Sequence, residues 1–261
     1  MTSSTASSAP SVKVEVAEGV LTATLAEPER RNVLSPKLLG ELLVAFERAR
    51  SDAAIRVVVL AAEGALFSGG GDLSMMKDAA GSTLRSGFAE LLGVMMRSDK
   101  PVVAKVQGPA LGGGLGLVVA STFALAAEGA TFGTPEIDVG LFPMMIMAPL
   151  VRTVPRRRLL AMMLTGEKLP ASEAERYGIV NEVVPAYALS GKVAELAARL
   201  AAKSPAAMRA GLRAYADQMD LGWEESLTML EGRLREVAAT DDAREGIAAF
   251  AARRAPVWTG R

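Results

Sequence analysis

PVVAKVQGPALGGGLG, residues 101–116, runs from a valine-rich segment into three consecutive glycines. Its β-branched start is typical of a buried strand, and glycines allow a backbone to approach a ligand closely. An earlier stretch at residues 55–71, IRVVVLAAEGALFSGGG, repeats the arrangement: a β-branched run, then Ala-Leu, then three glycines. We therefore expect two buried strands, each followed by a glycine loop.

Apolar residues recur at helical spacing over residues 84–96, between these two strands. A strand, a helix and a second strand predict a parallel pair joined by a crossover. Other patterns predict a hairpin of strands at 14–16 and 19–25, a helix opened by Ser35-Pro36, a short strand at 131–137 and a helix opened by a capping box at Ser172–Glu175. Helices are expected from Ser190 to the end, one of them opened by Ser204-Pro205. The fold class is therefore α/β, with a helical appendage at the C-terminus.

The composition limits the chemistry. Among 261 residues there is no histidine and no cysteine, which excludes Ser-His-Asp triads, thiol nucleophiles, disulfides and metal sites built on these ligands. Carboxylates, hydroxyls, Lys/Arg and backbone amides remain. The 29 basic and 29 acidic residues balance, so we expect neither nucleic acid nor a membrane surface as a partner.

Two segments bear on the location of the protein. Residues 1–11, MTSSTASSAPS, lack the basic and apolar regions of a signal peptide and predict a flexible tail, so we expect a cytoplasmic protein. Residues 106–127 carry no charge and are long enough to cross a membrane. Five glycines and three polar residues interrupt this run, which favours a buried core segment.

The glycine loops do not match nucleotide-binding patterns. Neither extends to G-x-G-x-x-G, and no G-x-x-x-x-G-K-[ST] occurs in the chain. One glycine triplet alone is explained by close packing of a helix on a strand, but two matched triplets favour a binding site. Two backbone N–H groups that converge from two loops would form an oxyanion hole for a carbonyl oxygen that gains charge.

Six motifs, in order, resemble the enoyl-CoA hydratase/isomerase (crotonase) family. They are residues 27–35 (EPERRNVLS), 65–73 (ALFSGGGDL), 108–116 (GPALGGGLG), 132–137 (FGTPEI), 171–181 (ASEAERYGIVN) and 243–250 (AREGIAAF). The resemblance implies a crotonase-like spiral of ββα units over residues 12–190 and a C-terminal helical trimerisation region over residues 191–261. It also implies a homotrimer or a hexamer made of two trimers.

The resemblance assigns the oxyanion hole to the backbone N–H groups of Gly71 and Gly113. They would hold the thioester oxygen of an acyl-CoA, so coenzyme A enters as part of the substrate, and neither a separate cofactor nor a metal is expected. Ser68 and Gly69 match the stretch that lines the adenine pocket. Four more residues correspond to contacts with coenzyme A phosphates or adenine, although an exposed arginine is usually only a solvated surface residue: Arg30, Arg31, Phe250 and Arg253.

Glu136 matches the proton-transfer carboxylate of the family. Hydratases of the family use a second glutamate, which would fall at position 116, where this chain has glycine. An isomerase that moves one proton along the acyl chain needs only Glu136. We therefore expect an enoyl-CoA isomerase-type enzyme, with an enoyl-CoA hydratase of the β-oxidation type and a non-catalytic acyl-CoA-binding paralogue as alternatives. Asp138 would share the side of Glu136 in an extended segment, which makes it a candidate auxiliary acid.

Phe142, Met144 and Met145 follow Glu136 in an apolar loop. Apolar neighbours would raise the pKa of Glu136 by desolvation. Flexible methionine side chains suit an acyl-chain pocket, and they suit core or subunit-interface packing equally well.

Overall fold

The computed structural model describes residues 9–72 and 87–261. The strands are β1 (Val12–Ala17), β2 (Val20–Leu25), β3 (Val57–Ala62), β4 (Val102–Val106), β5 (Ala110–Leu111), β6 (Phe123–Ala127), β7 (Thr131–Gly133), β8 (Lys168–Pro170) and β9 (Glu182–Val184). The helices are α1 (Pro36–Ser51), α2 (Gly87–Met96), α3 (Gly113–Ala120), α4 (Met144–Thr153), α5 (Arg156–Thr165), α6 (Ala171–Arg176), α7 (Leu189–Ala201), α8 (Pro205–Gln218), α9 (Trp223–Ala238) and α10 (Asp241–Ala251), with 3-10 helices η1 (Pro28–Arg30) and η3 (Pro135–Val139).

The main sheet has the strand order β1-β2-β3-β4-β6-β9. β1 and β2 form the predicted antiparallel hairpin, and Glu18 and Gly19 at its turn both have positive φ, as a tight hairpin turn of this kind requires. The other pairs are parallel, including β3 with β4. The predicted crossover is thus confirmed, although its helix is described only from Gly87 and the predicted start at residue 84 lies outside the described residues.

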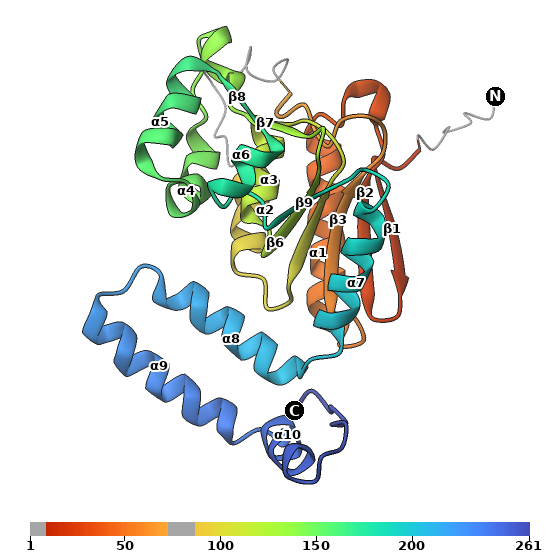
Figure 1. The fold of residues 1–261 in the computed structure, drawn as a ribbon, viewed down its shortest axis with the longest axis vertical. Coiled ribbons are helices and arrows are strands. Elements are labelled where there is room, and N and C mark those ends of the chain that lie inside the picture. Colours follow the sequence, from red (N-terminus) through yellow and green to blue (C-terminus); the bar gives the residue numbers. More distant parts are fainter. Residues whose placement is uncertain (1–8, 73–86) are drawn as a thin grey trace, which may run out of the picture.

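Helices cover both faces of this sheet, which explains why β3 is apolar along its length. Val58 and Leu60 belong to the core cluster that also includes the buried faces of α1, α2 and α3. Val57 and Val59 point the other way and pack with α7 (Figure 1). A strand buried on both sides gains from every side chain, at roughly 1.5–3 kcal/mol for each Val or Leu taken out of water.

The second, smaller sheet has the order β5-β7-β8 and gives the fold its spiral form. Ser68 pairs with Ala110 in a parallel bridge, and Ala110 pairs in turn with Phe132. After leaving the main sheet, each successive segment of the chain therefore packs beside the corresponding segment of the preceding turn of the spiral. A helix follows: α3 after β5, and α4 after β7.

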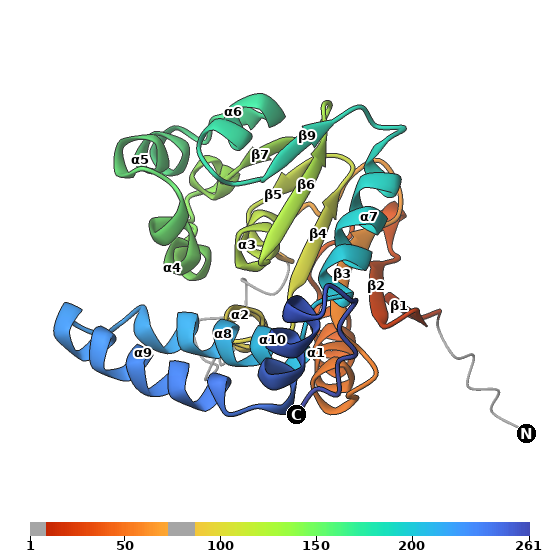
Figure 2. The same ribbon diagram turned by 60° about the horizontal axis from the view of Figure 1, so that its bottom comes forward.

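The helices α8, α9 and α10 stand apart from the sheet and pack against one another (Figures 1 and 2). Ser204 caps α8 through an N–H···Oγ bond from Ala207, as the Ser-Pro pattern predicts. α7 belongs to the sheet, because Leu189, Val193 and Leu196 are buried on it. The predicted boundary between residues 190 and 191 therefore falls inside α7.

Three local predictions are wrong. The loop expected around Met144 and Met145 is instead the first turn of helix α4. The strand expected over residues 131–137 ends at Gly133, because Thr134 and Pro135 open the 3-10 helix η3 instead. The capping box expected at Ser172 does not form, because α6 begins at Ala171, directly after Pro170, with no side-chain cap. Within the described residues, no helix is long and apolar enough to span a membrane, and residues 106–127 are divided among the end of β4, the strands β5 and β6, the helix α3 and the turns between them.

Asp242 attaches the end of the chain to the start of α8. This carboxylate is 1% exposed, and it accepts hydrogen bonds from Ser204 Oγ at 2.7 Å and from the N–H groups of Ala206, Thr259 and Gly260 at 3.3, 2.8 and 3.0 Å. Burial alone would raise the pKa of Asp242. The four donors outweigh that effect, and the pKa lies below its ordinary value.

Replacing Asp242 with Asn should destabilise the C-terminal helices by about 2 kcal/mol, because an amide presents its own hydrogens to the surrounding donors. A carboxylate whose pKa is lowered by folding stabilises the fold above its unfolded-state pKa, about 3.9, and loses that contribution as the pH falls through the folded value. Thermal unfolding at pH 7 and near pH 3 measures both effects. Asp241→Asn, at an exposed neighbour, is the control, and an equal loss there would contradict the assignment.

Candidate active site

The two glycine loops lie side by side. Ser68 pairs with Ala110 in parallel, so the residues three places further on, Gly71 and Gly113, are opposite each other. A Cβ atom placed on Gly113 would lie only 3.5 Å from the backbone nitrogen of Gly71. The structure thus brings together the two backbone amides that the sequence predicts as a pair.

Both amides are available to a ligand. Gly113 is the first residue of α3, and the first N–H groups of a helix have no acceptor one turn earlier. Across the described ranges, neither the N–H of Gly113 nor that of Gly71 donates a hydrogen bond within the protein. Two free donors this close, one of them at the positive end of a helix, can stabilise an oxygen that gains negative charge.

Buried Asn32 holds the first glycine loop in place. Its Nδ2 donates to the carbonyl oxygens of Glu63, Leu66 and Phe67 at 2.9, 3.1 and 3.2 Å, and its Oδ1 accepts from the N–H of Glu27 at 3.0 Å. Asn32 also has a positive φ of 49°, which Asn tolerates better than most residues. No pattern in the sequence predicts this role of Asn32, and its place in the motif at residues 27–35 is the only signal that points to it.

Ser68 also supports the loop through its side chain. Its Oγ donates to the carbonyl of Asn32 at 2.8 Å and accepts from the N–H of Gly70 at 3.2 Å, and the residue is fully buried. Both hydrogen-bonding functions of the hydroxyl are therefore used within the protein. A ligand would contact the main chain next to Ser68 and not its side chain.

Glu136 lies against the second glycine loop. A Cβ on Gly112 would be 2.6 Å from Glu136 Oε1, and the φ of Gly112 is +50°, so this position requires glycine on both counts. Glu136 sits in the first turn of η3, and its Oε2 is buried with no hydrogen-bond partner in the described part of the chain. The carboxylate therefore reaches the loop that carries the Gly113 amide.

Burial raises the pKa of Glu136, and its own backbone N–H offsets this only in part. The charged form loses hydration in these surroundings and gains no cation, which is the environment of a carboxylate that can both accept and return a proton near neutrality. Gly116 occupies the position at which the sequence resemblance places the second glutamate of hydratases. It faces the side chains of Phe88 and Ile146.

Asp138 does not share the side of Glu136. Successive residues of a 3-10 helix are about 120° apart, so η3 turns Asp138 away from the direction that an extended segment would give it. Its carboxylate is exposed and lies next to Gly166, where a Cβ would be 2.9 Å from Oδ1. This placement gives no support to Asp138 as an auxiliary acid.

Two of the predicted coenzyme A contacts lie beside the first glycine loop. The N–H of Gly69 donates to the carbonyl of Arg31 at 2.8 Å, and the Arg31 side chain lies over Gly69. Arg30 is 3.7 Å from the Asp72 carboxylate. Both arginines are exposed to solvent beside the first glycine loop.

Phe250 and Arg253 come from a different part of the molecule. Phe250 is on α10, which packs mainly on α8 and α9, and its side chain is 88% exposed. Arg253 follows α10 with a φ of +51° and is also exposed. No contact within this chain brings these two residues to the glycine loops among the described residues.

The predicted acyl-pocket residues have different surroundings. Phe142 is half-buried and packs on the core, whereas Met144 is 65% exposed at the start of α4. Met145 lines a pocket of about 320 Å³ between α2, α4 and the end of α8, together with Met96 and Met219. Of the three, Met145 thus lies where a flexible apolar chain could be accommodated.

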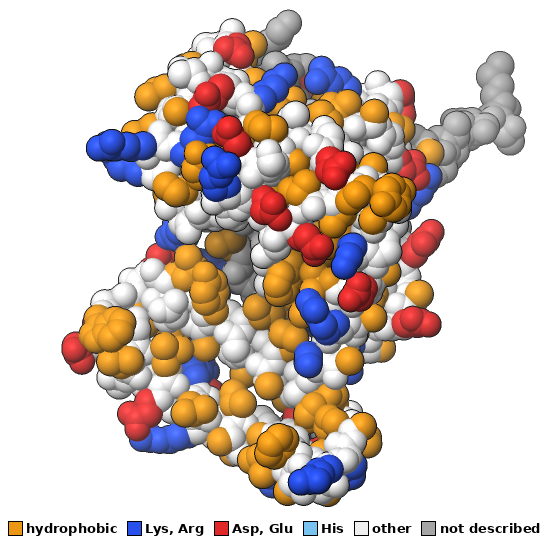
Figure 3. All heavy atoms as spheres, in the orientation of Figure 1, with side chains coloured by type: hydrophobic (Ala, Val, Ile, Leu, Met, Phe, Trp, Pro, Cys, Tyr) orange, Lys and Arg blue, Asp and Glu red, His pale blue; other side chains and the backbone are white. Residues whose placement is uncertain are grey.

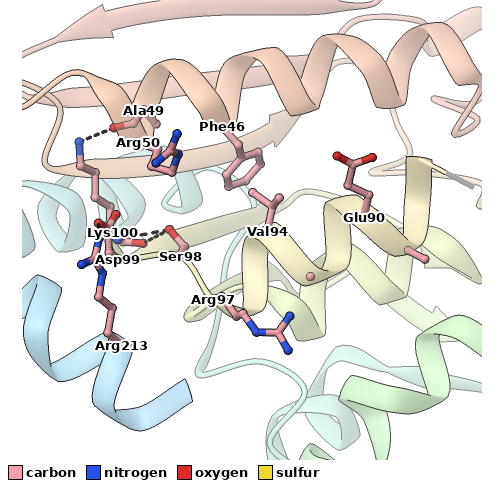
Figure 4. Close-up of a pocket in the computed structure, with 12 residues that line it drawn as sticks. Phe46, Ala49, Arg50, Glu90, Val94, Arg97, Ser98, Asp99, Lys100 and Arg213 are labelled. Atoms are coloured by element: carbon pink, nitrogen blue, oxygen red, sulfur yellow. Dashed lines mark hydrogen bonds and ion pairs between the residues drawn. The ribbon is translucent and has the colours of Figure 1, made fainter. Parts of the chain in front are cut away.

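A larger pocket of about 500 Å³ lies between α1, α2 and α8 (Figure 4). Lys100 donates there to the carbonyls of Ala49 and Asp52 at the end of α1, and Arg213 pairs with Asp99 at 2.8 Å. Neither Glu136 nor the glycine loops line it. Its polar groups join both α1 and α8 to the segment at Asp99 and Lys100, so Glu136 and the glycine loops remain the candidate site.

Comparison with known proteins agrees with this geometry. The 2,3-dehydroadipyl-CoA hydratase of Escherichia coli K12 is 34% identical over 245 residues, which cover 93% of this chain and 96% of that protein. The (E)-benzylidenesuccinyl-CoA hydratase of Thauera aromatica is also 34% identical, over 95% of this chain and 99% of that protein. Among solved structures, an enoyl-CoA hydratase of Mycobacterium smegmatis matches with a TM-score of 0.92 and 31% identity, covering 96% of this chain and 99% of the other.

The family profile described as enoyl-CoA hydratase/isomerase matches residues 15–261, which include both glycine loops and Glu136. The fold, the paired amides and the match over nearly the whole length agree, and the chain belongs to the enoyl-CoA hydratase/isomerase family.

Proposed function

We propose that this protein binds an unsaturated acyl-CoA thioester and moves its double bond, as an enoyl-CoA isomerase does. The observation that carries the proposal is the placement of Glu136: this partly buried carboxylate lies against the loop of the Gly113 amide, with no other charged group contributing to its raised pKa. One base beside an oxyanion hole made of two backbone amides is sufficient to move one proton along an acyl chain.

The proposed reaction proceeds in two proton transfers. The thioester oxygen accepts hydrogen bonds from the N–H groups of Gly71 and Gly113. Glu136 takes a proton from C2 of a 3-enoyl chain, and the electron pair of that C–H bond spreads over the dienolate to the oxygen. The protonated Glu136 then gives its proton to C4, and the double bond forms between C2 and C3. Nothing is added or lost, so no water is needed.

Hydration is the second candidate function. The names of the relatives favour it, since the Escherichia coli and Thauera aromatica proteins are both named hydratases. Here Glu136 alone would have to activate the water, because position 116 is glycine. Assays with a 3-enoyl-CoA and with crotonyl-CoA separate the two functions. Binding of both without turnover would instead support a non-catalytic acyl-CoA-binding paralogue.

Replacing Glu136 with Gln should lower kcat for a 3-enoyl-CoA by about 10²-fold or more, because the amide cannot accept the proton. Asp138→Asn, which changes the exposed carboxylate two residues away, should leave kcat within about threefold, since it touches no reacting atom. Steady-state rates measure both. A variant lacking Glu136 that retains the full rate would contradict the assignment of the base.

The same assignment determines the pH dependence. Glu136 must be ionised to accept a proton, so kcat/KM should fall on the acid side through a pKa above the ordinary 4.5. A carboxyl whose pKa is raised by folding destabilises the fold at neutral pH, and this cost decreases as the pH falls below the raised pKa and is gone below the unfolded-state pKa. The Gln variant should therefore melt no earlier than the wild type at pH 7, which separates lost catalysis from lost folding.

Gly113→Pro removes one proposed donor and should lower kcat by about 10²- to 10³-fold. Proline suits the first position of a helix, so α3 itself should tolerate it. Gly113→Ala is the matched control: both variants place a Cβ 2.8 Å from Leu34 Cδ1, but only proline lacks the N–H. Equal loss in the two variants would point to crowding and away from an oxyanion hole.

We further propose that the protein forms a homotrimer or a hexamer through its C-terminal helices. In Figure 3 these helices form the lower part of the molecule, and a hollow separates them from the part that contains the main sheet. Hydrophobic side chains are exposed on the surface of this lower part. On α9, an apolar stripe at helical spacing is 75%, 48%, 36% and 68% exposed: Trp223, Leu227, Leu230 and Leu234. A stripe of this kind on one helix is typical of a surface that a second subunit covers. Arg30, Arg31, Phe250 and Arg253 would then contact coenzyme A from two subunits.

Leu234→Glu should shift the mass measured by sedimentation towards that of one chain, because it places a charge in the apolar stripe. Glu231→Gln, on the same helix, should leave the mass unchanged. A wild-type protein that sediments as a monomer would contradict the proposed assembly.

A further inference from the structure

The surface of α3 at Gly116 is filled by side chains from two other helices. A Cβ placed on Gly116 would lie 2.4 Å from Ile146 Cγ2 and 3.1 Å from Phe88 Cζ. Both contacts are shorter than ordinary van der Waals separations, so even alanine would have to displace a neighbour. Ile146 is 2% exposed and Phe88 is 7% exposed, which leaves them little room to move.

One of these two side chains also borders the proposed oxyanion hole. The ring tip of Phe88 lies 3.4 Å from where a Cβ of Gly113 would be, one helical turn before Gly116. Phe88 comes from the first turn of α2 and Ile146 from α4, and α3 packs between these two helices. We call Phe88 and Ile146 the apolar plug, because together they extend from the hole to position 116.

The plug occupies the space that a second acid would need. Hydration requires a water held over the acyl chain and a group that orients it, and a side chain at position 116 would have to enter the volume of Ile146. Isomerisation requires neither. The unpartnered Oε2 of Glu136 agrees with a site in which no second polar side chain approaches the base.

We propose that Ile146, with Phe88, is the specificity-determining element that keeps water out and limits the site to single-base proton transfer. This inference rests on the proposed isomerase function. It adds that the missing glutamate at position 116 cannot simply be restored. The side chain of Ile146 has to be made smaller at the same time, because the two positions compete for one volume.

The test is a cycle of Gly116→Glu, Ile146→Ala and the double variant, each assayed for hydration of crotonyl-CoA, isomerisation of a 3-enoyl-CoA and melting temperature. Gly116→Glu alone should melt about 5 °C lower and gain no hydration. The double variant should recover part of that loss and hydrate crotonyl-CoA at least about tenfold faster than either single variant.

Leu150 provides the matched control, since it is also buried, on the same helix one turn further. Gly116→Glu combined with Leu150→Ala opens a cavity of similar kind away from position 116 and should gain neither stability nor hydration. If the larger variants fail to fold, the cycle of Gly116→Ala with Ile146→Ala replaces them: hydration by Ile146→Ala should rise relative to isomerisation, and Gly116→Ala should cost less melting temperature in that background.

Two results would contradict the proposed role of the apolar plug. One is hydration by Gly116→Glu alone without loss of stability. The other is a double variant that folds and isomerises but hydrates no faster than its Leu150 counterpart. Failure of the proposed function looks different: the wild type would then hydrate crotonyl-CoA through Glu136 and would not isomerise, whereas the coupling of melting temperatures between positions 116 and 146 would persist.

Discussion

The active site depends on the close contact between two main-chain segments. Residues 65–68 lie directly on residues 108–114, so that a Cβ on Gly108 would be 1.9 Å from the carbonyl oxygen of Ala65 and one on Gly114 would be 2.7 Å from Ser68 Cβ. No side chain fits between them, and the parallel bridge at Ser68 and Ala110 fixes their register. Because of this contact, the backbone amides of Gly71 and Gly113 lie close together, and the side chains of Asn32 and Ser68 hold the first of the two loops.

The chemistry follows from what surrounds these amides. Without histidine or cysteine, carboxylates, hydroxyls and Lys/Arg are left for proton transfer, and in the proposed reaction Glu136 carries it out. An ordinary exposed glutamate would be too weak a base in the first step, because a carboxyl with a pKa of about 4.3 readily gives up its proton at neutral pH. Burial against the glycine loop changes that balance for Glu136, since its charged form loses hydration. Apolar side chains line the neighbouring positions: Leu34 and Phe88 lie next to Gly113, and Phe88 and Ile146 lie next to Gly116.

The local patterns of the sequence predicted the hairpin, the parallel strands, the start of α1 at Ser35 and the start of α8 at Ser204, because caps and turns depend on neighbouring residues. Predictions that depended on distant contacts were less successful. The extended segment expected through Glu136 became a 3-10 helix, which separates Asp138 from Glu136. The hydrogen bonds of Asn32 to residues 63–67 leave no periodic signal in the sequence.

The sequence by itself determined the set of chemical groups: two glycine triplets after buried strands, one glutamate in an apolar segment, and a glycine where a second glutamate could stand. The tertiary structure alone decided how these groups meet. Aligning the two triplets in the sequence would place Gly71 opposite Gly114, but the bridge at Ser68 and Ala110 places it opposite Gly113. Likewise, Ile146 fills the space at Gly116 although thirty residues separate them. The register between two segments, and the choice of which side chains fill the same space, depend on how distant segments pack. Neither can therefore be derived from one segment at a time.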